Sequence, residues 1–235
     1  MLTSLKHKFH LENIETLRQH IEEQGEWVGG WGTYLSTPLP SVTSPLQQLK
    51  YVAIDFETSG LDFKHDQILS IGLVPFSFQQ IELSTVDELF ISHGQYITAK
   101  SASVNQLTPK HLSQGLTIDA AMNKLFETLA GKVVLAHGAF IEKSFLSRYL
   151  SKKFGIVKLP FYFIDTMELE RRFLSSNLAH SPASFQLDDL RDNLGFPAYY
   201  NHSAASDALA CAELFIARVH KTTSLANAAL HKVMS

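Results

Sequence analysis

Two carboxylates, Asp55 and Glu57, flank Phe56 at the end of the apolar run Tyr51-Val-Ala-Ile. Side chains two apart on a strand point to the same face of a sheet, so a strand over 51–56 places the two carboxylates side by side. Held at the edge of a buried strand they repel each other, which raises at least one pKa unless a cation intervenes. Clustered carboxylate oxygens are the ligands that Mg²⁺ and Mn²⁺ prefer. The alternative is a solvated strand end capped by Thr58 and Gly60, and the pair alone does not separate the two interpretations.

Two further carboxylates, Glu142 and Asp207, fall on predicted helices. Glu142 opens a helix predicted over 142–152, where a carboxylate often does no more than interact with the helix dipole. The functional alternative is that it faces Asp55 and Glu57 across the sheet edge. Asp207 lies in a helix predicted over 204–220, and a carboxylate on a helix that packs closely is rarely buried without a partner. Its neighbours form a stripe of small and apolar residues: Ala204, Ala208, Cys211 and Phe215.

One histidine, His202, comes shortly before Asp207. On a continuous helix the two side chains would be separated by roughly 140°. If they act together, His202 must lie on a turn before the helix. The neighbouring residues Asn201 and Ser203 are compatible with such a turn. A single histidine in front of a helix is otherwise unremarkable, so its interest depends on the carboxylates.

These residues require a scaffold, and the hydrophobic pattern predicts one of alternating strands and helices. Strands followed by helices, after an early run of hairpin-like strands, indicate an α/β sandwich with a mixed sheet. The predicted strands cover 51–56, 67–76, 88–91, 132–136 and 161–164, and the predicted helices cover 118–129, 142–152, 187–194 and 204–220.

Residues 1–48 differ from the rest of the chain. Apolar residues recur at helical spacing up to Ile21, and a Gly- and Trp-rich stretch with Trp27 and Trp31 follows. Residues 36–45 contain three prolines and read as an extended linker. One amphipathic helix cannot form a core, so this arm is expected to pack on the main body or on a partner. The tryptophans are interpreted as a buried anchor for it.

The composition limits the possible classes of protein. The chain has 235 residues and a formal net charge of −3, which argues against a protein that coats long stretches of duplex. An enzyme that grips only the last few nucleotides remains compatible. Cys211 is the single cysteine, which excludes an intramolecular disulfide framework and fits the cytoplasm. No apolar run predicts a membrane span, and the N-terminus lacks the apolar core of a secretory signal.

Three segments together resemble the motifs of the DEDDh-type 3′–5′ exonucleases. They read IDFETSG, AHGAFIEKSFL and HSAASDALACAELF, in the order of that family, which includes the proofreading epsilon subunit of bacterial DNA polymerase III and RNase T-like enzymes. The resemblance covers roughly residues 49–219 and implies a ribonuclease-H-like fold with a five-stranded mixed sheet flanked by helices. It divides the chain into an N-terminal arm and linker (1–48), an exonuclease domain (49–222) and a C-terminal tail (223–235).

The resemblance also implies a site that holds two divalent metal ions, Mg²⁺ or Mn²⁺. Asp55 would bridge the ions, Glu57 and Asp207 would complete one of them, and Glu142 would hold the other through water. His202 would take the proton from the attacking water. The expected product is a nucleoside 5′-monophosphate released from the 3′ end.

Substrate contacts are expected just beyond the motifs. By similarity, the backbone around Thr58 and the side chain of Leu61 would meet the terminal nucleotide. Phe140 would stack on a base or belong to the core. Four cations of the second motif would follow the phosphates or cover a solvated helix face: Lys143, Arg148, Lys152 and Lys153. The expected partners are a single-stranded 3′ end, with DNA favoured over RNA, and a protein bound through residues 1–48, but no membrane.

One departure from the family pattern concerns the second motif. Where the family has His-Asn, three residues and Asp, this chain has His137-Gly138 and then Glu142. A longer side chain predicts a slower enzyme or a changed metal preference. The alternative is a nucleic-acid-binding or scaffold module that kept the fold and lost catalysis. A structural partner of a polymerase would need a docking segment, and the family's C-terminal polymerase-binding extension is expected to be absent.

Overall fold

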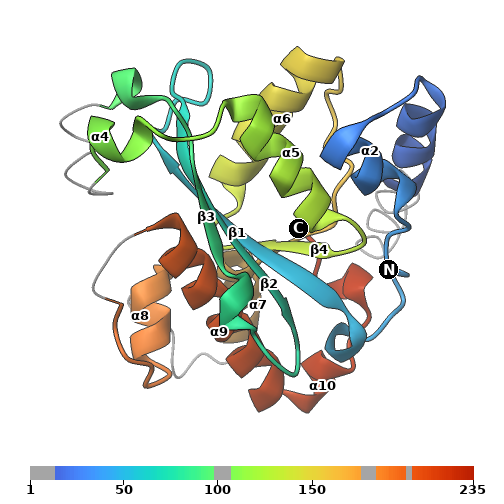
Figure 1. The fold of residues 1–235 in the computed structure, drawn as a ribbon. Helices are drawn as coiled ribbons and strands as arrows, with labels where there is room; N and C mark the ends of the chain where they lie inside the picture. Colours follow the sequence, from blue (N-terminus) through green and yellow to red (C-terminus); the bar gives the residue numbers. More distant parts are fainter. Residues whose placement is uncertain (1–13, 98–106, 176–183, 200–202) are drawn as a thin grey trace.

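The computed structural model describes residues 14–97, 107–175, 184–199 and 203–235. Its centre is a five-stranded mixed sheet with the strand order β3-β2-β1-β4-β5 (Figure 1). The strands are β1 (Lys50–Thr58), β2 (Ile68–Ser77), β3 (Asp87–Phe90), β4 (Val133–Ala136) and β5 (Phe163–Asp165). The first three pair antiparallel, whereas β4 and β5 continue the sheet in parallel. The predicted fold class is confirmed.

Helices cover both faces of the sheet, as Figure 1 shows. On one face α5 (Ile118–Leu129) and α6 (Phe140–Phe154) pack against the strands, and on the other lies α9 (Ala204–Lys221). Residues Val52 to Ala53 of β1 are fully buried because each face of this central strand meets a helix layer. The remaining helices are α2 (Gly29–Ser36), α4 (Pro109–Leu112), α7 (Thr166–Ser175), α8 (Leu187–Asp192) and α10 (Thr223–Ala226).

The sequence pattern missed several helices and found the longer ones. Helix α5 has the predicted bounds, and α6 begins two residues earlier than predicted and ends two later. Helix α7 was not predicted, because it starts at Thr166 directly after β5 ends at Asp165, and no turn residue in the sequence separates the strand from the helix. Tertiary contacts with α9 and β5 stabilise this short helix, as they do most helices in folded proteins.

The N-terminal arm is packed on α5 and shares its core. Residues 14–23 are helical, and α2 follows them. Trp31 is only 3% exposed and stacks on Phe154, so the interpretation of a buried tryptophan anchor is confirmed for Trp31. A Cβ on Gly30 would lie 1.8 Å from the carbonyl oxygen of Asn123, so only glycine allows α2 to approach α5 this closely.

The end of the chain returns to the sheet and to the segment that precedes β1. Leu46 N donates to Ala228 O at 3.0 Å, and Ser235 N donates to Phe163 O at 3.0 Å on the edge strand β5. Leu230 is completely buried. Within the described ranges, no helix has the length and apolar composition needed to cross a membrane.

Candidate metal centre

Asp55, Glu57 and Asp207 come together where β1 ends and α9 begins. Each carboxylate offers one oxygen, and these three oxygens lie within 4.8 Å of one another. Asp55 and Glu57 share one face of β1, as strand alternation predicts. The register with β2 shifts between Glu57 and Thr58, so the regular ladder is interrupted directly after the two carboxylates. The sheet therefore ends in a group of acidic side chains.

Asp207 reaches this group because α9 begins in direct contact with β2. Gly72 pairs with Asp55 across the two strands, and a Cβ on Gly72 would lie 2.0 Å from the carbonyl oxygen of Ala204. Any other residue there would push the start of α9 off the sheet. Ser203 caps the helix by accepting a hydrogen bond from Ser206 N at 3.2 Å. Asp207 is thereby placed in the first helical turn.

The acidic group carries more negative charge than its surroundings compensate. Burial, followed by the charges of Glu142, Asp207, Glu57 and Glu88, raises the pKa of Asp55 well above its usual range. Glu88, on β3, accepts a hydrogen bond from the Ser70 hydroxyl at 2.9 Å and was not recognised from the sequence. A divalent cation would relieve the repulsion, since it offers positive charge to several carboxylates at once.

Glu142 lies in the first turn of α6 and points into the protein. It is 4% exposed, and no described residue forms a hydrogen bond with its Oε2 atom. Burial raises its pKa from 4.5 to about 8, although hydrogen bonds from the backbone of Glu142 and Phe56 act in the opposite direction. Glu142 is close enough to act on the pKa of Asp55, but the three oxygens within 4.8 Å belong to the other carboxylates. Its part in metal binding stays a prediction.

The turn before Glu142 is held by Asp165, a residue that the sequence motifs did not single out. One carboxylate oxygen of Asp165 accepts from Gly138 N at 2.9 Å and from Met167 N at 3.0 Å, and the other accepts from Ala139 N at 3.0 Å. Gly138 has a φ of 71°, a left-handed conformation that glycine adopts at little cost. The sequence signals for Asp165 are its position directly after the strand predicted over 161–164 and the resemblance of the segment Ile164-Asp-Thr-Met-Glu-Leu to the exonuclease family.

Of the two histidines in the motifs, His137 belongs to the described residues and His202 does not. Nδ1 of His137 bonds with the Thr166 hydroxyl at 2.8 Å, and Nε2 bonds with Phe185 O at 2.9 Å. Burial lowers the pKa of His137, so this side chain connects β4, α7 and the segment before α8 as a neutral group. His202, the predicted base, lies outside the described residues.

Comparison with known proteins identifies the family. The model of the RNase T family, described as "Exonuclease", matches residues 52–215. The chain belongs to this exonuclease family. A DNA polymerase III PolC-type from Thermotoga petrophila is 28% identical over 179 residues. That match covers 75% of this chain but only 12% of the relative's length.

Solved structures confirm the fold of this exonuclease. The nuclease domain of 3′hExo, a DEDDh family member, has a TM-score of 0.61 and 14% identity, over 73% of this chain and 92% of that chain. Exonuclease I from E. coli, in complex with an oligonucleotide, has a TM-score of 0.64 and 12% identity, over 76% and 42% of the two chains. The predicted resemblance to DEDDh-type exonucleases is thus confirmed.

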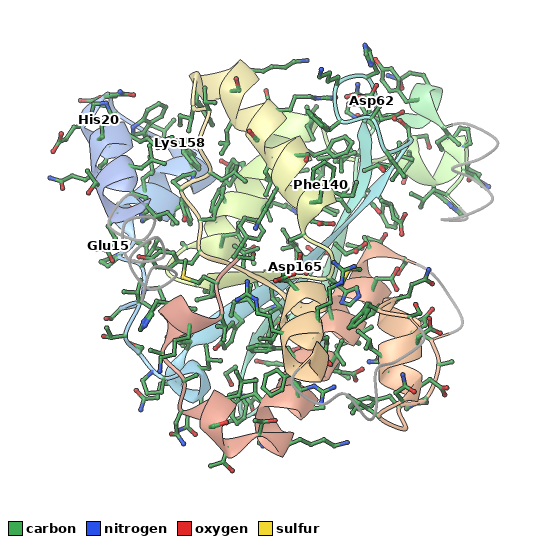
Figure 2. The ribbon with its side chains drawn as sticks, turned by 180° about the vertical axis from the view of Figure 1, so that it is seen from behind. Glu15, His20, Asp62, Phe140, Lys158 and Asp165 are labelled. Carbon is green, nitrogen blue, oxygen red and sulfur yellow. The ribbon has the colours of Figure 1, made fainter. Side chains whose placement is uncertain are left out.

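Two of the predicted substrate-contact residues, Leu61 and Phe140, lie on the surface of the protein. Leu61 is 75% exposed and Phe140 is 67% exposed, so Phe140 is not a core residue. The Thr58 hydroxyl donates to Gly60 O at 2.8 Å and thereby shapes the turn that presents Leu61. Figure 2 shows Phe140 on α6, between Asp165 and Asp62 of the β1–β2 loop in this view, and its ring lies 6.5 Å from that of Phe63 in the same loop.

Proposed function

We propose that this chain removes nucleotides from the 3′ end of single-stranded nucleic acid, with DNA favoured over RNA, and releases nucleoside 5′-monophosphates. The observation that carries the proposal is the group of Asp55, Glu57 and Asp207, whose ligand oxygens lie within 4.8 Å of one another in a chain of the exonuclease family. The solved structures in the comparison include proteins bound to rAMP and to an oligonucleotide, which supports a nucleic acid substrate. The buried free thiol of Cys211 fits the cytoplasm as its location.

The donor set fits hard divalent cations. All the donors are carboxylate oxygens, and burial together with neighbouring negative charge raises the pKa of Asp55. In the proposal Asp55, Glu57 and Asp207 would hold two ions, Mg²⁺ or Mn²⁺, and Glu142 would help to hold them. When bound, the ions supply electrostatic stabilisation to the attacking and the leaving oxygen.

The protein's own residues then position the substrate and move the proton. His202 takes a proton from the attacking water, whose oxygen forms a bond to phosphorus while the bond from phosphorus to the 3′ oxygen of the preceding nucleotide breaks. The exposed side chain of Leu61 contacts the terminal nucleotide and is presented by the turn at Thr58, whereas the exposed ring of Phe140 stacks on a base. A protein partner bound through residues 1–48 would meet the outer face of the arm, where Val28 is 83% exposed.

The test uses single-stranded DNA and RNA oligomers labelled at either end, incubated with Mg²⁺ or Mn²⁺. We expect stepwise shortening from the 3′ end, release of 5′-monophosphates, and no reaction in excess chelator. Asp87→Ala is a matched control, because this exposed carboxylate on β3 lies outside the group of three. Undiminished digestion in chelator, or loss of a 5′ label first, would contradict the proposal.

A second candidate is a nucleic-acid-binding module with weakened catalysis. The burial of Glu142, and its longer side chain where the family has aspartate, favour it, because a changed ligand would weaken the hold on a second ion. The same experiment separates the two candidates, since such a module would bind the oligomers without shortening them.

A further inference from the structure

A groove runs along the outer face of α6, next to the β1–β2 loop. It has a volume of about 540 Å³ and is lined by Phe63, Lys64, Ser144, Ser147, Ser151 and Lys152, among others. The three serines recur at helical spacing, so they form one stripe of hydroxyl groups on the helix. Within the described part of the chain, no carboxylate lines this groove. Its lining combines lysines and hydroxyl groups with the apolar side chains of Phe63, Val157 and Leu159, which suits a strand that offers both phosphates and bases.

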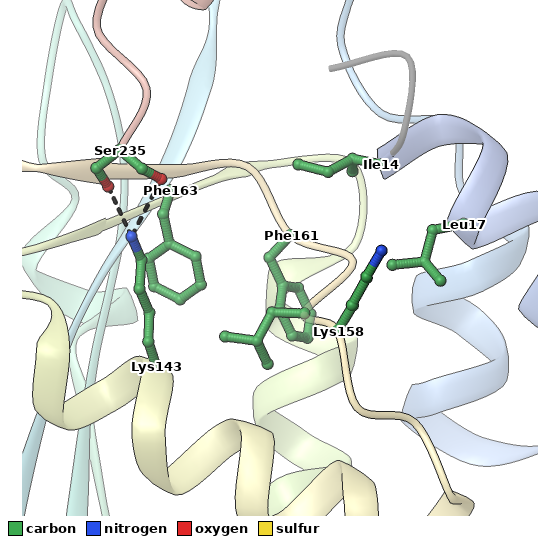
Figure 3. Close-up of a pocket in the computed structure, with 8 residues that line it drawn as sticks. Ile14, Leu17, Lys143, Lys158, Phe161, Phe163 and Ser235 are labelled. Carbon is green, nitrogen blue, oxygen red and sulfur yellow. Dashed lines mark hydrogen bonds between the residues drawn. The ribbon is translucent and has the colours of Figure 1, made fainter. Parts of the chain in front are cut away.

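The cations of the groove differ in whether they are already bound to protein groups. Arg148 donates to the carbonyl oxygens of Phe63 and Asp66 and to Gln67 Oε1, so it holds the β1–β2 loop in place. Lys143 donates to O and Oγ of Ser235 on the far side of α6 (Figure 3). In contrast, no described residue accepts a hydrogen bond from the side-chain ammonium of Lys64 or Lys152. Lys152 lies about two helical turns beyond Ser144 on α6. Lys64 and Lys152 are the cations that remain for a ligand.

One end of the groove lies at the first turns of α6, where Lys143 lines it next to Glu142. Helix α6 starts at Phe140, and its first turn sends Glu142 inward towards the carboxylate group. The Phe63 and Phe140 rings lie 6.5 Å apart, edge to face, and Phe63 lines the groove, so an aromatic pair stands at this end of it. Exposed aromatic rings stack on bases of any sequence. From Phe140 to Lys152 the helix rises about 18 Å, the length of about five stacked nucleotides at roughly 3.4 Å each.

We propose that this groove binds the single strand upstream of the nucleotide that is removed, with Lys64 and Lys152 on its phosphates and Phe63 and Phe140 on its bases. The inference rests on the proposed function, since it assigns a path to the substrate of the same site. It predicts an enzyme that prefers substrates of about five or more unpaired nucleotides. It also predicts that sequence has little influence, because phosphate contacts and stacking carry no base code.

The experiment compares a double variant, Lys64→Glu with Lys152→Glu, against wild-type protein and a control, Lys124→Glu. Lys124 is an exposed lysine of α5 outside the groove, so its variant carries a charge reversal without touching the strand. The substrates are oligothymidylates of two to twelve nucleotides and thymidine 5′-(p-nitrophenyl phosphate), which has no upstream strand. We expect kcat/KM of the wild type to rise with length up to about five nucleotides. The double variant should lose about tenfold on the twelve-mer and nothing on the chromogenic ester.

Two outcomes would overturn the proposal that the groove binds the strand, and a third would contradict the proposed function instead. Strand binding in the groove is excluded if the wild type cuts the two-mer and twelve-mer equally well, or if the double variant matches Lys124→Glu on the twelve-mer. If no substrate is cut, the proposed function fails, and fluorescence anisotropy of labelled twelve-mer then decides the groove. There the double variant should bind more weakly, and the slope of log affinity against log salt should fall by about 1.4.

Discussion

Two acidic sites lie close to each other in this protein and differ in how their charge is compensated. Asp165, at the end of β5, accepts hydrogen bonds from four backbone N–H groups, so its charge is satisfied by the protein. Asp55, at the end of β1, lies among other carboxylates, and burial together with their charge raises its pKa. Asp165 stabilises a turn, whereas the carboxylates around Asp55 would be stabilised by a bound cation. A carboxylate at a strand end is thus structural or functional according to the donors that its neighbours supply.

The largest expected effect is on turnover. Asp55→Ala and Asp207→Ala should each lower kcat by at least about 10³-fold, because each removes a carboxylate from the proposed metal centre. Without metal both variants should be at least as stable as the wild type, since repulsion is relieved. Single-turnover kinetics and thermal unfolding in chelator measure the two quantities. Near-wild-type kcat in either variant at saturating metal would remove that residue from the ligand set.

The metal-free protein should lose stability as pH rises. The folded pKa of Glu142 is raised from 4.5 to about 8, so the folded state holds more protons than the unfolded state across that window. The free energy of unfolding therefore falls between about pH 4.5 and pH 8, by an amount on the order of 3 kcal/mol. Urea titrations across this range check the slope. Glu142→Gln should flatten the curve, whereas a slope unchanged in this variant would assign the effect to other groups.

Asp165→Ala should act on stability more than on chemistry. It leaves the N–H groups of Gly138, Ala139 and Met167 without their acceptor, and the free energy of unfolding should fall by about 2 kcal/mol. Asp165→Asn keeps one acceptor oxygen and should lose less. Chemical denaturation compares them. A variant with normal stability but no activity would place Asp165 in the metal centre and end the distinction drawn between the two acidic sites.

Glu142 is intermediate between the structural carboxylate Asp165 and the carboxylates of the proposed metal centre. Its variants should therefore give the smallest changes in rate. Glu142→Asp shortens the side chain and should lower kcat about tenfold, most of all in Mg²⁺, which tolerates distorted geometry poorly. Glu142→Gln removes the charge and should lower kcat about thirtyfold. Titrations of rate against Mg²⁺ and Mn²⁺ test both. Unchanged rates and metal affinities in both would mean that Glu142 only begins a helix.

The sequence by itself determined the strand-and-helix order and the positions of the acidic residues. Strand alternation suffices to place Asp55 and Glu57 on one face, because that periodicity is a local property of the backbone. The long amphipathic pattern of residues 118–129 likewise predicted α5, since its apolar stripe is visible in the residues themselves. Helix α7 escaped this approach because its stability comes from its neighbours.

Only the tertiary structure decided which of these carboxylates lie together and which are satisfied. Asp207 joins the group because Gly72 allows α9 to touch β2, a contact between residues far apart in the sequence. The burial of Glu142 and the hydrogen bonds from Gly138 and Ala139 to Asp165 depend in the same way on elements that fold against each other. Solvation and hydrogen bonding are set by the complete surroundings of a side chain, and a pKa follows from those surroundings.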